Sequence, residues 1–154
     1  MAYEIERKFL VKNNSYRQSS QKSTHILQAY LSTNPDSTVR VRIIDNNKAY
    51  ITVKSRNHGV VRHEWEYEIP VIDARQMLDS CRVTPLIDKT RYLCGQWEID
   101  CFAGVLSGLT IAEIELQHEN EQFEIPDWVG KEVTGDKRYY NSALATCQEV
   151  PPTK

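Results

Sequence analysis

The chain has 154 residues, of which 26% are charged and 40% hydrophobic, and its formal net charge is -2. These values fit one globular domain over residues 1–154 and exclude a general electrostatic attraction to nucleic acid. No apolar run is long enough to span a bilayer, and the N-terminus lacks the apolar core of a signal peptide. We therefore expect a cytoplasmic protein with no nucleic-acid or membrane partner.

The cysteines and histidines give little sign of a redox or zinc site. Cys81, Cys94, Cys101 and Cys147 form no CxxC pair, and the histidines show no zinc-binding spacing. We expect reduced, mostly buried thiols, which agrees with the cytoplasmic compartment.

Charged and apolar residues alternate with a period of two along most of the chain, which predicts β-strands. In the first of these segments, Glu4, Glu6 and Lys8 share one side, whereas Ile5 and Phe9 point the other way. Eight segments show such a pattern or a comparable strand composition, and they cover residues 3–10, 26–31, 38–44, 48–54, 61–69, 87–93, 96–102 and 110–116. Most of the connections between them are short and hairpin-like, which favours an antiparallel sheet.

The segments between these strands predict turns and a few helices. Residues 45–47 and 57–59 have the composition of turns, and residues 12–23 predict a loop with a short helical turn. Asp73 is a candidate N-cap for one clear helix, with Gln76 three residues later, and a last helix is expected from about residue 138 to 148. The predicted fold class is α+β, mainly β.

The polar faces of the predicted strands carry almost only ionisable side chains. One interpretation is that these are solvated cross-strand pairs on a sheet with one wet face. A second is that the sheet closes and that the charges line its interior, where they must be paired or must bind something. Lys and Arg suit a phosphate chain, and Glu-x-Glu pairs suit a hard divalent cation. Together they predict a metal–triphosphate site.

Several of these segments follow the order of a known family. Residues 4–8 contain the pattern ExExK, and further matching segments lie at residues 28–31, 40–42, 52–55, 62–66, 89–92, 97–100, 112–116 and 132–139. In this order the sequence resembles the CYTH superfamily, also called triphosphate tunnel metalloenzymes, and its compact length resembles the short bacterial branch. The resemblance covers nearly the whole chain.

The resemblance implies an eight-stranded antiparallel closed β-barrel, the triphosphate tunnel, with a few flanking helices and a C-terminal helix. It implies Mg²⁺ or Mn²⁺ bound by carboxylates at Glu4, Glu6, Asp100, Glu113 and Glu115, with support from Glu98. The basic residues that match phosphate-binding positions are Lys8, Arg40, Arg42, Lys54, Arg62, Lys89, Arg91 and Arg138. Among all these residues, Glu4, Glu6 and Lys8 are assigned to catalysis. Glu64 and Glu66 are either functional or orient neighbouring basic groups. Arg7 points away from this face and is left out of the site.

The expected reaction is metal-assisted hydrolysis of a triphosphate. Inorganic tripolyphosphate is the first choice of substrate, because little sequence is left for a segment that would recognise a base. Two other enzymes are alternatives: a class IV adenylate cyclase, which converts ATP to cyclic AMP and pyrophosphate, and a thiamine triphosphatase, which would use Trp65, Trp97 or Trp128 for stacking. Two non-catalytic alternatives are a polyphosphate- or nucleotide-binding protein and a charged-surface interaction module. The sequence leaves the oligomeric state open.

Overall fold

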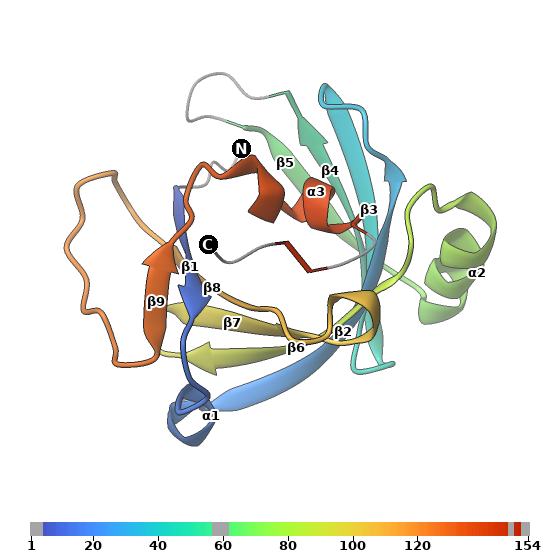
Figure 1. The fold of residues 1–154 in the computed structure, drawn as a ribbon. Coiled ribbons are helices and arrows are strands. Elements are labelled where there is room, and N and C mark those ends of the chain that lie inside the picture. Colours follow the sequence, from blue (N-terminus) through green and yellow to red (C-terminus); the bar gives the residue numbers. More distant parts are fainter. Residues whose placement is uncertain (1–4, 57–61, 148–149, 152–154) are drawn as a thin grey trace. The chain divides into compact units, whose positions relative to one another are not determined.

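A computed structural model describes residues 5–56, 62–147 and 150–151 (Figure 1). The strands within this part are β1 (Glu6–Val11), β2 (Lys22–Ser32), β3 (Ser37–Ile44), β4 (Lys48–Ser55), β5 (Glu64–Ile69), β6 (Ile87–Cys94), β7 (Trp97–Phe102), β8 (Thr110–Glu115) and β9 (Val129–Glu132). The helices are α1 (Tyr16–Ser19), α2 (Val71–Cys81) and α3 (Asn141–Leu144), and two 3₁₀-helices are η1 (Gly104–Leu106) and η2 (Lys137–Tyr139). The prediction of a mainly β fold with few helices is confirmed.

The nine strands form an antiparallel sheet in the order β5-β4-β3-β2-β6-β7-β8-β1-β9. The predicted number of eight strands is therefore wrong. The described residues divide into two compact units, of which the first contains residues 25–56 and 62–88 and the second contains residues 5–24, 89–147 and 150–151. That residues 1–154 form a single domain stays a prediction.

The strand that the sequence does not predict is β9, which pairs with β1 (Figure 1). Gly130 lies inside it and is typical of a loop, but here it permits a close approach between the strands. A Cβ atom at Gly130 would lie 3.0 Å from the carbonyl oxygen of Leu10. The same residue that makes the segment resemble a loop is therefore what allows the pairing.

In the first unit, α2 packs against the apolar face of β3 and β4 (Figure 1). Ala74 and Leu78 of the helix join a buried cluster with Val41, Ile43 and Ala49 of the strands. This cluster occupies the apolar face that the alternating pattern predicts. Arg40 and Arg42 alternate with Val41 and Ile43 along β3 and therefore lie on the opposite face of the sheet.

Two local predictions in this unit have different outcomes. The hairpin between β3 and β4 is confirmed: Asp45 and Asn46 have φ values of 52° and 55°, and the backbone N–H of Asn47 donates to the carbonyl oxygen of Ile44 at 2.9 Å, which closes a tight turn. The helix start at Asp73 is wrong, because α2 begins at Val71 and Pro70 is its N-cap. Asp73 lies instead in the first turn, where its negative charge interacts favourably with the positive end of the helix dipole. The expected turn at residues 57–59 lies outside the described residues.

The second unit is built on an aromatic core. Trp97 contacts Phe9 edge-on at 5.4 Å between ring centroids and Trp128 at 5.4 Å. Tyr16 of α1 packs on Trp128 at 6.0 Å, so the predicted helical turn is present and is anchored in this core. The loop expected to run to residue 23 is shorter than predicted, because β2 already begins at Lys22.

The C-terminal helix is the weakest of the predicted elements. Instead of one helix from about residue 138, the chain forms η2, passes through an extended Tyr140 with ψ 143°, and then forms the four-residue α3. Asp136 caps η2 by accepting a hydrogen bond from the backbone N–H of Arg138. The predicted continuous helix is thus wrong over residues 138–147, and its expected end at residue 148 lies outside the described part.

Two other predictions concern solvent exposure and membrane spans. All four cysteines are free, but Cys81 is exposed and the other three are half-buried, so the expectation of mostly buried thiols is wrong. No helix within the described residues has both the length and the apolar character needed to cross a membrane.

Candidate functional site

In the second unit, charged side chains from four neighbouring strands share the sheet face opposite the aromatic core. The strand register places Lys8 opposite Glu113, Glu6 opposite Glu115, and Arg91 opposite Asp100. The predicted site residues that lie in this unit's strands are Glu6, Lys8, Lys89, Arg91, Asp100, Glu113 and Glu115. Glu4 lies outside the described residues.

Asp100 is the centre of a group of three charges, in which Asp100 and Lys89 are buried and Arg91 is half-buried. Arg91 donates to it from Nε to Oδ1 at 2.7 Å and from Nη2 to Oδ2 at 2.9 Å, and Lys89 Nζ lies 2.7 Å from Oδ2. Burial alone would raise the pKa of Asp100, but the two cations outweigh burial and hold it well below its usual range. Both carboxylate oxygens therefore serve to hold Lys89 and Arg91, and the metal-binding role of Asp100 stays a prediction.

A second group connects Glu113 with Glu6 and Lys8. The Glu6 and Glu113 side chains are hydrogen-bonded, and Lys8 Nζ lies 3.6 Å from Glu113 Oε1. Burial would raise the pKa of Glu113, but the hydrogen bond with Glu6 and the charge of Lys8 outweigh it, so the pKa is lowered. Lys8 also donates to the carbonyl oxygen of Tyr139 at 2.8 Å. Glu113 is therefore a carboxylate that stays ionised although it is half-buried.

The donor chemistry of this face fits a hard divalent cation. Glu6 and Glu113 bring two carboxyl groups into contact, and Glu115 is the cross-strand neighbour of Glu6. Carboxylate oxygens are the ligands that Mg²⁺ and Mn²⁺ prefer. Among the described residues, which exclude Glu4, no three acidic, histidine or cysteine side chains are already grouped to hold an ion. Binding would thus need Glu4, water or substrate oxygens in addition.

In the first unit, the charged face is built on β3 and β4 and contains a buried cation. Arg40 is 8% exposed, and its Nη2 reaches Thr52 Oγ1 only at 3.5 Å. Its Nε is buried and has no hydrogen-bond partner within the described part of the chain. A buried guanidinium with an unsatisfied donor is costly, so the position favours an anionic ligand.

The two other predicted arginines of this unit donate to neutral oxygens. Arg42 Nε donates to Gln28 Oε1 at 2.7 Å. Arg62 donates from Nε to the carbonyl oxygen of Ser55 at 2.8 Å and from Nη2 to Thr38 Oγ1 at 3.3 Å. Lys54, also predicted, lies opposite Glu64 in the register of β4 and β5.

Sequence reasoning missed the neutral residues that hold these arginines. They are Gln28, Thr38 and Thr52, and each is buried. Each of them shares a strand face with charged residues, and the period-two spacing indicates this position. Amides and hydroxyls are not ionisable, however, so charge alone does not identify them. Glu66 accepts a hydrogen bond from Thr52 at 2.8 Å, and whether it is functional or orients basic groups stays a prediction.

Arg138 forms an ion pair with Asp136. Its guanidinium donates to Asp136 from Nη2 at 2.7 Å and from Nε at 3.1 Å, and its side chain is 45% exposed. It belongs to η2 and does not begin a long helix. Its role in phosphate binding stays a prediction.

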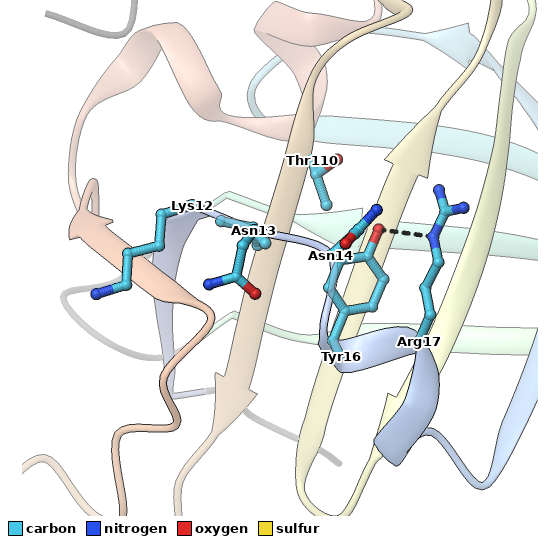
Figure 2. Close-up of a pocket in the computed structure, with 7 residues that line it drawn as sticks. Lys12, Asn13, Asn14, Tyr16, Arg17 and Thr110 are labelled. Carbon is cyan, nitrogen blue, oxygen red and sulfur yellow. Dashed lines mark hydrogen bonds between the residues drawn. The ribbon is translucent and has the colours of Figure 1, made fainter.

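A surface pocket of about 410 Å³ lies near α1 (Figure 2). It is lined by Val11, Lys12, Asn13, Asn14, Tyr16, Arg17 and Thr110. Arg17 Nε donates to the Tyr16 hydroxyl at 3.4 Å, as the dashed line in Figure 2 marks. Thr110 alternates with Glu113 along β8 and therefore faces the other side of the sheet. The pocket contains none of the predicted site residues.

Comparisons with known proteins extend over nearly the whole chain. The sequence model of the CYTH domain matches residues 2–143. A protein named inorganic triphosphatase from Acetivibrio thermocellus is 47% identical over 148 residues, which cover 94% of each chain. One of the same name from Nitrosomonas europaea is 38% identical over 149 residues, which cover 92% of this chain and 96% of the relative. The crystal structure of the inorganic triphosphatase NE1496 aligns with a TM-score of 0.70 and 33% identity over 99% of both chains.

Proposed function

Because this chain belongs to the CYTH domain family, we propose that it hydrolyses inorganic tripolyphosphate in a reaction that depends on Mg²⁺ or Mn²⁺. The observation that carries the proposal is the guanidinium of Arg40, which is buried with an unsatisfied Nε among the described residues. A multiply charged phosphate chain supplies the anionic oxygens that this donor lacks. The relatives named inorganic triphosphatase support the choice of substrate.

The phosphate chain would be held by the basic residues that match the phosphate-binding positions of the family. We assign this role to Lys8, Arg40, Arg42, Lys54, Arg62, Lys89, Arg91 and Arg138. Their charge offsets the negative charge that develops on the leaving phosphate. Lys89 and Arg91 are held in fixed orientation by Asp100, which lowers the ordering cost of phosphate binding.

The divalent ion would be held by the carboxylates of Glu4, Glu6, Glu113 and Glu115, with Asp100 in support. Such an ion, when bound, polarises a phosphoryl group toward attack by water. Within the chain itself, Lys8 keeps Glu113 ionised by its charge, and an ionised carboxylate is what a cation requires. Glu4, Glu6 and Lys8 are the residues to which we assign catalysis.

The placement of the tryptophans favours inorganic tripolyphosphate over thiamine triphosphate. Trp97 and Trp128 are buried in the aromatic core at 6% and 4% exposure, where they pack on each other. Trp65 alternates with Glu64 and Glu66 along β5 and therefore faces away from the charges. None of the three side chains is placed to stack on a ring bound at the charged face of its own unit.

Two further expectations belong to the same proposal. One is that the sheet closes into the triphosphate tunnel that the family resemblance implies, which a crystal structure with bound tripolyphosphate would test. The other is that the protein works in the cytoplasm, which fractionation of the source cells would test.

The proposed activity is tested by incubating the purified chain with tripolyphosphate, ATP and thiamine triphosphate, each with Mg²⁺, with Mn²⁺ and with a chelator. We expect phosphate release from tripolyphosphate that depends on the metal and exceeds release from the other two substrates. Cyclic AMP and pyrophosphate from ATP would identify a cyclase instead. Tight binding of tripolyphosphate without turnover would identify a non-catalytic binding protein, and absence of binding would contradict the proposal altogether.

A further inference from the structure

We propose that three buried neutral side chains of the first unit are positioning residues, which orient arginines for polyphosphate without adding negative charge. They are Gln28, Thr38 and Thr52, at 3%, 8% and 3% exposure. The inference rests on the proposed function and extends it by naming residues that touch no substrate themselves but set the affinity of the site.

Gln28 carries the clearest of the three contacts. It lies directly opposite Arg42 in the register of β2 and β3, and its Oε1 accepts a hydrogen bond from Arg42 Nε at 2.7 Å. A contact to Nε fixes the plane of the guanidinium, because Nε is rigidly joined to the two terminal nitrogens. The carboxamide thereby determines the direction in which the Nη donors of Arg42 point.

The two threonines act on the other arginines in the same way. Thr38 Oγ1 accepts from Arg62 Nη2 at 3.3 Å. Thr52 Oγ1 donates its proton to Glu66 Oε2 at 2.8 Å, which leaves its lone pairs for Arg40 Nη2 at 3.5 Å. The long contact to Arg40 involves only Nη2, and Nε of the same guanidinium still has no acceptor among the described residues.

Neutral partners matter because the ligand is a polyanion. In the second unit the bidentate partner of Arg91 is the carboxylate of Asp100, which compensates part of the positive charge. An amide or hydroxyl oxygen gives the same orientation but brings no formal charge that would repel phosphate oxygens. The three neutral acceptors of the first unit thus hold a guanidinium in place without bringing a formal charge of their own.

The competing interpretation is that these side chains serve only to satisfy buried polar groups during folding. Under that interpretation, their loss lowers stability but leaves the affinity of the folded protein for polyphosphate unchanged. The two interpretations therefore separate when stability and affinity are measured on the same variants.

The variants for this experiment are Gln28→Leu, Gln28→Glu, Thr38→Val and Thr52→Val, with Thr84→Val as the matched control. Thr84 is also buried in this unit, at 4% exposure, but its hydroxyl accepts from the backbone N–H of Tyr30 at 3.0 Å, and no hydrogen bond joins it to an arginine among the described residues. Tripolyphosphate binding is measured by calorimetry in the presence of a chelator, and KM and kcat are measured with Mg²⁺. Thermal unfolding of each variant reports its stability.

We expect Gln28→Leu and Thr52→Val to weaken tripolyphosphate binding and to raise KM by on the order of 10-fold, with a smaller change in kcat. We expect Gln28→Glu to bind at least as weakly as Gln28→Leu, although it keeps an acceptor at the same place. Thr84→Val is expected to lose stability but to keep its affinity.

Affinities equal to that of the wild type in Gln28→Leu, Thr38→Val and Thr52→Val would overturn the positioning role. Wild-type affinity in Gln28→Glu alone would overturn the requirement for a neutral partner. If the wild-type chain itself does not bind tripolyphosphate, the proposed function fails, and that result differs from both of these.

Discussion

Asp100 and Arg91 form a bidentate ion pair, with both carboxylate oxygens of Asp100 accepting hydrogen bonds at 2.7 and 2.9 Å. Lys89, whose side chain is 1% exposed, lies 2.7 Å from the same carboxylate. One anion therefore offsets two cations, of which Lys89 is buried and Arg91 is half-buried. This makes Asp100 a structural requirement of the charged face, whatever its part in metal binding.

The first prediction is that Asp100→Asn destabilises the protein by about 3–5 kcal/mol, because it leaves buried Lys89 and half-buried Arg91 without their carboxylate. Urea denaturation at neutral pH measures this loss. Glu98→Gln is the control, since Glu98 meets Arg91 only at 3.5 Å and its side chain is 43% exposed, so about 0–1 kcal/mol is expected. Equal stability of the two variants would contradict the account of the buried pair.

The second prediction concerns the buried cation of the first unit. Arg40→Met removes a guanidinium whose Nε finds no acceptor among the described residues, so the ligand-free variant is expected to unfold at a higher temperature than the wild type. The same variant is expected to bind tripolyphosphate on the order of 10- to 100-fold more weakly, because a charge-assisted contact is lost. Thermal unfolding with and without tripolyphosphate measures both effects.

The two effects of Arg40→Met have opposite signs, which is the signature of a residue kept for binding. Arg56→Met is a suitable control, since Arg56 is exposed and pairs with Asp36 at 3.6 Å on the surface. If Arg40→Met lowers the unfolding temperature and leaves affinity unchanged, then Arg40 is a structural residue and the central observation behind the proposed function is lost.

The third prediction tests the carboxylates assigned to the metal. Glu113→Gln and Glu115→Gln keep the size of the side chain but remove its charge, so metal-dependent phosphate release is expected to fall by at least about 10- to 100-fold while the fold survives. Circular dichroism checks the fold, and the shift of the unfolding temperature on adding Mn²⁺ reports metal binding independently of turnover. Unchanged turnover and an unchanged Mn²⁺ shift in both variants would remove the metal assignment.

The charged faces could be predicted because the alternation of side chains along a strand does not depend on the tertiary structure. Arg40 and Arg42 are two residues apart, so any strand places them on one side. The pairing of Arg91 with Asp100 was less accessible, because it depends on the register of β6 and β7, which is set around Gly95 with a φ of 60°. The alternating pattern alone does not state which charges oppose each other.

The incorrect predictions share a physical cause: the local preference of a residue differs from the structure that its tertiary contacts impose. Gly130 is typical of a loop, but its missing side chain is what lets β9 approach Leu10. Tyr140 is a residue that helices tolerate, but it adopts an extended conformation and divides the expected C-terminal helix in two. Gln28 was seen only as part of a family pattern, because its function depends on the arginine across the strand pair.

The last prediction concerns Arg7, which was left out of the site and binds Glu132 of β9 instead, from Nη2 at 2.6 Å and from Nε at 2.9 Å. The hydrogen bond from Arg7 lowers the pKa of Glu132 against the opposing effect of burial, with help from Thr134. A carboxylate with a lowered pKa stabilises the fold above its unfolded pKa of about 4.3, and this contribution is lost as the pH falls through the folded pKa.

Glu132→Gln is therefore expected to unfold at a lower temperature than the wild type at pH 7, and the difference should shrink as the pH falls below about 4. The loss at pH 7 is small, about 1 kcal/mol or less, because both side chains are about one third exposed. Unfolding temperatures of both proteins between pH 3 and 7 measure it, with exposed Glu119→Gln as the control. A difference that stays constant over this range would show that Glu132 stabilises β9 by its shape and contacts and not by its charge.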